Sequence, residues 1–451
     1  MDMERKNKYV INDQYTFRLE YFGGLVLSQN VEDKFIISKE TYIFLKAYEK
    51  FTLDESIGIV SNIIGGKYEP EFEELIETKM LVYQENTLLE IPEKIPEFIS
   101  KIQEELRNVE GKSSLLFPLY ISIYPTPVCQ AFCKFCYFKD KGIKYSKKEN
   151  EFVSINYWKN VIDEILQYHG VGLSILGGEP TLYKDIDELL KYAIERKIKA
   201  SLTTNGLFMK ESTFDILTTK DQFIISMSLQ GIGEIHHKLT GIDFESVERR
   251  VKMFIKKGII PQINTVITEQ SIEDFERILD WCEYNGIEEV FLNLYNTLEE
   301  NTEKYKMNDY KSLEYRLNQY ILRKKYTFNL TFVGCLYYSA FYDENYQLTD
   351  PEFEKIFYGC EAGKTKIEIM PNGDVFPCVL MEHPIGNIKD QSVYDIWNKS
   401  AILGKMRTMR NKDERCINCS FYVFCNGGCP VRNEKNFYLK GDERCARLAL
   451  L

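Results

Sequence analysis

Between residues 115 and 305 the chain alternates short apolar runs with longer amphipathic stretches. The apolar runs are rich in β-branched and aromatic residues, which is typical of buried strands. They fall at residues 119–124, 172–176, 199–203, 223–228, 260–268 and 290–294. Helical periodicity lies between them, for example at residues 157–168, 186–196 and 272–284. This order predicts βα units with a parallel sheet and right-handed crossovers.

The first 84 residues follow a different pattern, which predicts a small α+β domain. Strands are expected at residues 17–22, 25–28 and 34–38, with Gly23 and Gly24 as a turn. Helices at residues 41–51, 54–63 and 71–79 and a strand at residues 80–83 follow. Thr52 is placed to cap the second of these helices.

Three further regions complete the domain prediction. Residues 85–113 are rich in Glu, Lys and Pro and are interpreted as a linker with a solvated helix up to about residue 107. The βα core occupies residues 114–305. A tyrosine-rich bridge covers residues 306–359, with helical character near 312–323 and strand character at 328–333. Residues 360–451 form a cysteine-dense domain.

Composition and charge exclude several classes of protein. A chain of 451 residues is expected to form two or three domains. The net charge of -11 argues against a nucleic-acid partner. No run approaches the ~20 apolar residues of a membrane helix, and no secretory signal is visible, so we expect a cytoplasmic protein without a membrane partner.

The distribution of cysteines indicates metal binding. Ten of the 12 lie within residues 129–136 and 360–445, and a cytosolic chain is not expected to build a disulfide framework. Cys129, Cys133 and Cys136 have the spacing Cys-x3-Cys-x2-Cys directly after the first predicted core strand. Three thiolates can hold three irons of a four-iron cluster and leave one iron open to a small molecule. A zinc site or reduced structural thiols are the alternatives.

This triplet, with Phe135 before its third cysteine and Tyr137 after it, resembles the signature of radical S-adenosylmethionine (SAM) enzymes. The resemblance implies a partial (β/α)6 TIM-like barrel and a [4Fe-4S] cluster that binds SAM.

Further motifs at the strand ends support the resemblance. Gly178 and Glu179 of a Gly-Gly-Glu-Pro motif would hold the SAM amino group, and Asn205 ends the third strand in a Thr-Asn-Gly motif. Ser228 would contact the ribose or the carboxylate of SAM. The chain departs from the family where an Arg is usual, and Lys238 is the expected substitute.

The C-terminal cysteines resemble the SPASM pattern, which implies two auxiliary [4Fe-4S] clusters. The outer cluster would use Cys416, Cys419, Cys425 and Cys445, and the inner one Cys360, Cys378 and Cys429. The inner cluster is then one ligand short, so Cys335 or another residue completes it, or it stays open to substrate. A zinc ribbon is the alternative. The isolated Cys282 is expected to be a buried small hydrophobe.

The N-terminal domain resembles the PqqD-like, winged-helix recognition element of radical SAM peptide maturases. This implies a ribosomal precursor peptide with a leader as substrate and an electron donor such as flavodoxin or ferredoxin. We expect thioether formation between a cysteine sulfur and a residue carbon. Carbon–carbon cross-linking and formylglycine formation in a sulfatase are the enzymatic alternatives. A zinc-bearing DNA-binding regulator is the non-enzymatic one.

Overall fold

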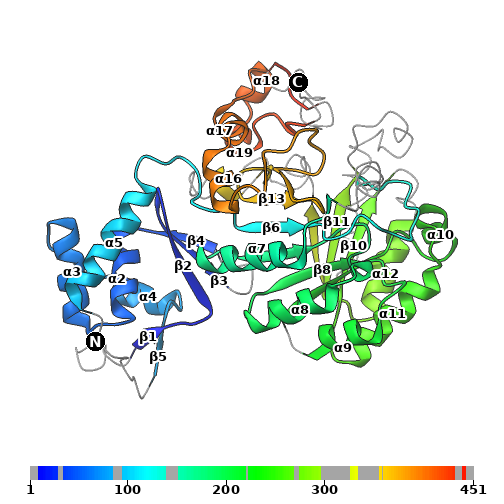
Figure 1. Ribbon diagram of the computed structural model, residues 1–451, viewed down its shortest axis with the longest axis horizontal. Coiled ribbons are helices and arrows are strands. Elements are labelled where there is room, and N and C mark those ends of the chain that lie inside the picture. The colour runs from blue at the N-terminus through cyan, green and yellow to red at the C-terminus, as the bar shows by residue number, and fades with distance from the viewer. Residues whose placement is uncertain are drawn as a thin grey trace. The chain divides into compact units, whose positions relative to one another are not determined.

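The computed structural model describes residues 9–28, 34–84, 94–138, 151–219, 222–268, 274–295, 326–333, 355–357, 359–431 and 439–442. The chain divides into two compact units, residues 1–117 and 118–451 (Figure 1). None of the described helices is both long and apolar enough to cross a membrane.

The first unit is an α+β domain, as predicted. Strands β2 (Tyr15–Glu20), β3 (Gly23–Ser28) and β4 (Lys34–Ile37) form an antiparallel sheet in that order, and β1 (Tyr9–Ile11) pairs with β5 (Leu81–Tyr83). Helices α2 (Lys39–Tyr48), α3 (Leu53–Ile64) and α4 (Phe72–Glu77) pack around one apolar core. Thr52 caps α3 in a reciprocal capping box with Glu55, which confirms its predicted role.

The turn predicted at Gly23 and Gly24 is wrong. Residues 21 and 22 form the turn, and the two glycines begin β3. They permit a close approach of β3 to its neighbours instead. A Cβ atom on Gly23 would lie 2.3 Å from the Ile37 carbonyl oxygen, and one on Gly24 would lie 2.9 Å from Tyr42 Cβ.

Part of the predicted linker belongs to this first unit. Residues 95–109 form helix α5 (Ile95–Val109), whose Phe98, Ile102 and Val109 are buried in the same core. After α5, residues 116 and 117 are bound by two side chains of β2. The Glu20 carboxylate accepts a hydrogen bond from the Leu116 N–H at 2.8 Å, and Arg18 donates to the Phe117 carbonyl at 3.0 Å. Residues up to 117 are therefore fixed to the first unit.

Replacing Gly58 with alanine is expected to stabilise the first unit. Gly58 lies inside α3, and an added Cβ would meet nothing within 4 Å. The substitution should raise the free energy of unfolding by about 0.5–1 kcal/mol, because alanine loses less backbone entropy in a helix. Calorimetry of the full chain measures the change. Gly23→Ala should instead destabilise the unit, and equal effects of the two substitutions would refute this account.

The second unit is built on one mixed sheet that contains all six predicted core strands. Its strands are ordered β12 (Asn329–Val333), β11 (Glu289–Leu294), β10 (Gln262–Ile267), β9 (Phe223–Ser228), β8 (Ala200–Thr204), β7 (Gly172–Ile175), β6 (Tyr120–Ile123), β13 (Lys366–Ile369), β14 (Asp374–Phe376) and β15 (Gly386–Asn387). The strands from β12 to β13 are parallel, and β14 and β15 are antiparallel.

Helices cover the outer side of this sheet (Figure 1). They are α7 (Ile155–Gln167), α8 (Ile186–Glu195), α9 (Glu211–Thr219), α11 (Phe244–Lys256) and α12 (Phe275–Tyr284). Ile123, Ile175 and Leu202 form a fully buried aliphatic row across β6, β7 and β8. Because successive side chains of a strand point to opposite faces, Ser122, Ser174 and Ser201 lie on the other face. The inner face of the sheet is therefore polar.

The cysteine-dense region extends the same sheet. Strand β13 pairs in parallel with β6, so Glu368 lies opposite Ser122. Helices α16 (Val393–Lys399), α17 (Ala401–Thr408), α18 (Glu414–Ile417) and α19 (Tyr422–Cys425) follow. The Glu164 carboxylate of α7 accepts hydrogen bonds from the Val393 and Tyr394 N–H groups at 3.1 and 3.0 Å. This region is thus anchored to the first βα unit of the sheet.

Candidate active site

The cysteine triplet lies in the loop after β6, at the carboxyl end of the parallel strands. The loop runs beside helix α10 (Glu234–Thr240). The Phe132 N–H donates to the Thr240 carbonyl at 2.8 Å, and the Lys134 N–H donates to the Leu239 carbonyl at 2.9 Å. Cys129 is exposed, whereas Cys133 and Cys136 are half-buried.

The Gly-Gly-Glu-Pro motif holds this loop from the other side. The Gly178 N–H donates to the Thr126 carbonyl at 2.9 Å, and the Glu179 N–H donates to the Val128 carbonyl at 2.7 Å. A Cβ atom on Gly178 would lie 2.3 Å from the Val128 oxygen, so only glycine allows this approach.

Glu179 is a buried hub that joins the ends of β7 and β8. Its side chain, 1% exposed, precedes the short 3-10 helix η2 (Pro180–Leu182). One oxygen accepts from the Thr181 N–H and hydroxyl and from the Thr204 hydroxyl, and the other accepts from the Asn205 N–H at 2.9 Å. Burial raises the pKa of this carboxyl, and these hydrogen bonds act in the opposite direction. Contact with the SAM amino group remains a prediction.

Asn205 connects this hub to the cysteine loop. Its Oδ1 accepts from Gln130 Nε2 at 3.0 Å, and its Nδ2 lies 3.8 Å from Cys129 Sγ. The Ala131 N–H lies 3.4 Å from the same sulfur. Cys129 therefore has two N–H donors directed at it, an arrangement suited to a negatively charged thiolate ligand.

Replacing Asn205 with alanine is expected to slow reductive SAM cleavage about 10- to 100-fold, the usual cost of losing a partner of a metal ligand. Formation of 5′-deoxyadenosine measures the rate. Asn285→Ala is the control, because among the described residues the Asn285 side chain bonds only the Trp281 carbonyl of helix α12. If both variants cleave SAM at the wild-type rate, Asn205 does not support the cysteine loop.

The three thiols suit an iron–sulfur cluster. Burial raises the pKa of Cys129 to about 11 and that of Cys133 further, and the neighbouring thiols add to both shifts. Bound iron would supply the positive charge that keeps them as thiolates. Within the described ranges, no three Cys, His, Asp or Glu side chains gather closely enough to bind a single metal ion. A four-iron cluster uses thiolates that are spaced more widely.

The aromatic residues of the triplet face different surroundings. Phe135 is buried and packs with Leu239 and Tyr295. The Tyr137 side chain is half exposed, and its hydroxyl lies 3.3 Å from that of Tyr124. Ser228 ends β9 and lies opposite Asn264 of β10. Direct contacts of Phe135, Tyr137 and Ser228 with SAM remain predictions.

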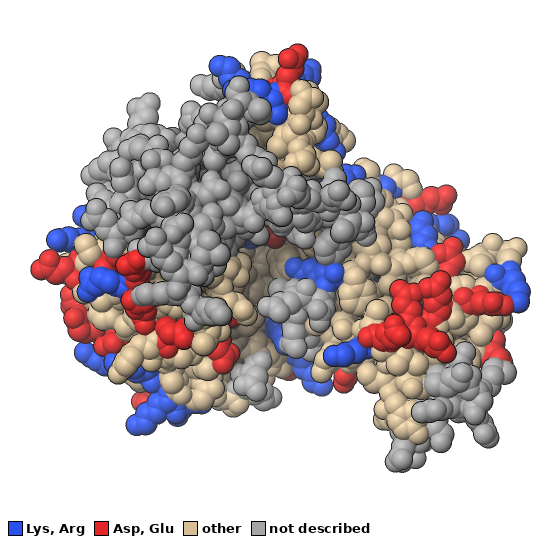
Figure 2. Space-filling model, turned by 180° about the vertical axis from the view of Figure 1, so that it is seen from behind, with Lys and Arg blue, Asp and Glu red and all other residues tan. Residues whose placement is uncertain are grey.

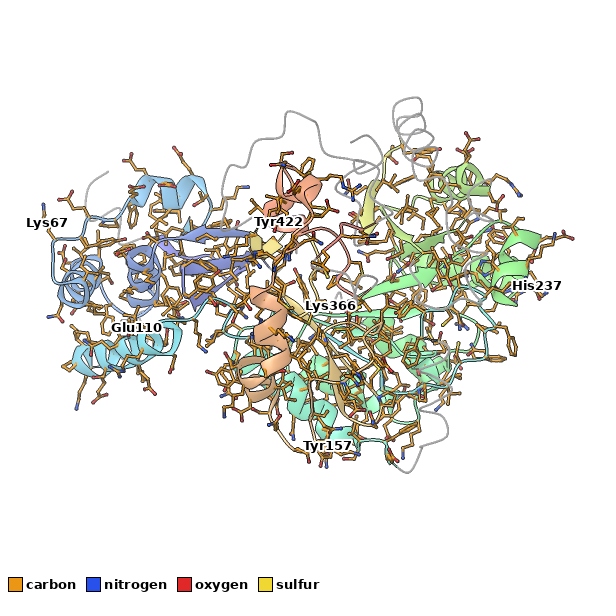
Figure 3. The ribbon with its side chains drawn as sticks, turned by 90° about the horizontal axis from the view of Figure 1, so that it is seen from above. Lys67, Glu110, Tyr157, His237, Lys366 and Tyr422 are labelled. Atoms are coloured by element: carbon orange, nitrogen blue, oxygen red, sulfur yellow. The ribbon has the colours of Figure 1, made fainter. Side chains whose placement is uncertain are left out.

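Lys238 is not joined to these groups by any described contact. Its side chain is 63% exposed, and its ammonium group lies 3.4 Å from a Glu234 oxygen on the same helix. The adjacent His237 lies at the periphery (Figure 3), 2.9 Å from the Asp243 carboxylate. The role of Lys238 toward the SAM carboxylate remains a prediction.

Sequence reasoning missed Arg250 of α11. Its Nε donates to the Gly206 carbonyl at 3.1 Å, and its guanidinium group lies over the Phe214 ring. It thereby supports the Thr-Asn-Gly turn from behind. On an amphipathic helix such an arginine looks like part of a solvated face, so the sequence contains no signal for this contact.

Four of the described SPASM cysteines, Cys416, Cys419, Cys425 and Cys429, lie in the short helices and turns of residues 414–431. Cys416 lies on α18 and Cys425 ends α19, while Cys416 and Cys429 are buried. Asn411 is 1% exposed and links three parts of this region. Its N–H donates to Asn426 Oδ1 and its Nδ2 to the Lys440 carbonyl, while its Oδ1 accepts from the Asp413 N–H. Tyr422 donates to the Asn411 carbonyl (Figure 3). Cys335 and Cys445 lie outside the described residues.

The other cysteines have distinct surroundings. Cys378 and Cys136 pack against the same apolar cluster, which surrounds Tyr124. Cys378, one of the three cysteines predicted to bind the inner cluster, thus lies near the triplet loop. Cys282 is fully buried on α12, as predicted for a small hydrophobe.

Comparisons with known proteins agree with these features. The Radical SAM superfamily model matches residues 123–282, and the SPASM iron–sulfur cluster-binding model matches residues 360–420. The AdoMet-dependent heme synthase of Oleidesulfovibrio alaskensis is 26% identical and covers 68% of this chain and 81% of its own. The subtilosin biosynthesis protein AlbA of Bacillus subtilis is 24% identical and covers 74% of this chain and 70% of its own.

Solved structures of SuiB from Streptococcus suis match both units. The structure with bound S-adenosylmethionine has a TM-score of 0.82 and 26% identity, and the match covers 97% of this chain and 99% of SuiB. The structure with the precursor peptide SuiA has a TM-score of 0.80 and covers 97% and 100%. The chain is therefore a radical SAM enzyme with a C-terminal SPASM domain, and it uses a SAM-binding [4Fe-4S] cluster and auxiliary iron–sulfur centres.

Proposed function

We propose that this enzyme is a maturase of a ribosomally made precursor peptide. One observation carries the proposal: the similarity to SuiB, a protein solved with a precursor peptide, covers 97% of the chain and thus includes the first unit. The heme synthase match covers only 68% of the chain. Recognition of a leader segment requires a binding domain in addition to the catalytic core.

The first unit has an edge at which a leader could bind. Among the described strands, β4 is an edge of its sheet, since it pairs only with β3, and a peptide can add a strand to a sheet at such an edge. The domain resembles a winged helix, but residues 1–84 hold 15 Asp and Glu against 10 Lys and Arg. Figure 2 shows acidic side chains gathered on one face of this unit. This charge supports a peptide partner and counts against DNA.

The reaction we favour is thioether formation. The radical cluster would be held by Cys129, Cys133 and Cys136, and with SAM it supplies a 5′-deoxyadenosyl radical that removes hydrogen from an unactivated carbon. Two auxiliary [4Fe-4S] clusters would use the cysteines assigned above. The inner one would have an open position for a sulfur atom of the substrate. The polar inner face of the sheet suits a peptide segment.

No disulfide joins the cysteines in the described part of the chain, which supports our proposal of a reducing, cytoplasmic location. An electron donor of the flavodoxin or ferredoxin class would reduce the radical cluster.

Anaerobic co-expression with a short peptide encoded nearby tests the function. A maturase should return the peptide with two hydrogen atoms fewer. Thiol alkylation then distinguishes the products, because a thioether removes one reactive cysteine and a carbon–carbon link does not. Iron analysis should give about twelve irons per chain, from three four-iron clusters. An unmodified peptide beside an enzyme with full iron content would contradict the proposal, and modification of a cysteine-free peptide would exclude the thioether.

A further inference from the structure

Glu368 is a buried acid on the inner face of the barrel sheet. It lies on β13, the strand that the SPASM region adds beside β6, and its side chain is 7% exposed. Across the strands it faces Ser122, whose buried hydroxyl has no hydrogen-bond partner in the described part of the chain. An acid and a hydroxyl in this position leave polar atoms available to a bound ligand or water.

Two polar side chains hold the carboxylate. The Tyr124 hydroxyl donates to Oε2 at 3.3 Å, and the Lys366 ammonium group lies 3.2 Å from Oε1. Tyr124 is fully buried, whereas the Lys366 side chain is 29% exposed. Lys366 lies in the middle of the second unit (Figure 3). Glu368 is therefore held in a fixed position on the inner face of the sheet.

This acid lies between the two cysteine regions. The Tyr124 ring packs with Phe138, Met370 and Phe376, and the cluster they form contacts both Cys136 and Cys378. Glu368 is therefore hydrogen-bonded to Tyr124, whose apolar cluster contacts a cysteine of each region. A purely structural role does not explain an ion pair at this position, because burying charged groups costs desolvation free energy that apolar residues avoid.

Building on the proposed function, we propose that Glu368 accepts the proton that the peptide releases when its cross-link forms. In the reaction a carbon–hydrogen bond and a sulfur–hydrogen bond are replaced by one carbon–sulfur bond. One hydrogen leaves as an atom to the 5′-deoxyadenosyl radical. The other leaves as a proton to Glu368, and the remaining electron goes to a one-electron acceptor of the iron–sulfur class.

Glu368→Gln tests this assignment, because it keeps the size of the side chain but cannot take up the proton. With deuterated peptide, labelled 5′-deoxyadenosine should still form. Cross-linked peptide per 5′-deoxyadenosine should fall at least about tenfold, given the usual contribution of a general base. Freeze-quenched samples should show an accumulated peptide radical in electron paramagnetic resonance. Asp390→Asn, at an exposed acid that follows β15 of the same sheet, is the control and should behave like wild type.

An unchanged product ratio in an iron-replete Glu368→Gln enzyme would overturn the proposal. If that variant lacks iron, Glu368→Asp gives a second test. It keeps a carboxylate that can take up the proton, so its ratio of cross-linked peptide to 5′-deoxyadenosine should stay close to that of wild type. A ratio at least about tenfold lower in an iron-replete Glu368→Asp enzyme would refute the role. Failure of the wild-type enzyme to modify any peptide would instead refute the proposed function itself.

Discussion

Replacing Cys129, Cys133 and Cys136 together with alanine is expected to abolish 5′-deoxyadenosine formation. The loop would lose its thiolates, and about four irons, one cluster, should be lost per chain. The SPASM cysteines are separate in sequence, so their iron should remain. Iron analysis and product chromatography on the anaerobically purified variant measure both effects.

Cys282→Ala is the matched control for this variant. Cys282 is also buried, but it lies on α12 and has no described contact with the triplet loop. It should keep full iron content and SAM cleavage, with at most a modest loss of stability from the missing sulfur. SAM cleavage by the triple variant would show that these residues do not hold the radical cluster.

The second large effect is expected for Glu179→Ala. The carboxylate accepts hydrogen bonds from Thr181, Thr204 and Asn205 inside a dry site. Removing it leaves several buried donors without a partner and should lower the free energy of unfolding by about 3–5 kcal/mol. Because the N–H of Asn205 also loses its acceptor, the residue that contacts the cysteine loop is no longer held in place, and SAM cleavage should fall at least about 100-fold.

Thermal unfolding and 5′-deoxyadenosine formation measure the two consequences of Glu179→Ala separately. Glu211→Ala, at an exposed position in the first turn of α9, should change stability by less than about 0.5 kcal/mol and leave SAM cleavage intact. Equal behaviour of the two variants would mean that Glu179 does not organise the site.

The sequence could predict features that depend on local pattern. The strands of the core are continuous apolar runs, so their positions follow from periodicity, and the strand predicted at residues 223–228 matches β9. The cysteine spacings identify their chemistry because a cluster needs several thiolates close together. The cap at Thr52 depends on residues three positions apart.

Features that depend on distant contacts were not predictable. The role of Gly23 is set by the carbonyl of Ile37, and α5 is a packed helix because its apolar stripe meets the core of the first unit. The charge of Lys238 does not reveal in which direction helix α10 orients this side chain. Glu368 looks ordinary in sequence, and only the pairing of β13 with β6 places it beside Tyr124.

The most direct test of peptide maturation is hydrogen transfer from peptide to cofactor. Reduced enzyme, SAM and a uniformly deuterated precursor peptide are combined, and the 5′-deoxyadenosine is analysed by mass spectrometry. The account predicts that deuterium appears in 5′-deoxyadenosine in proportion to modified peptide. Formation of 5′-deoxyadenosine without deuterium, while the peptide stays unmodified, would contradict it.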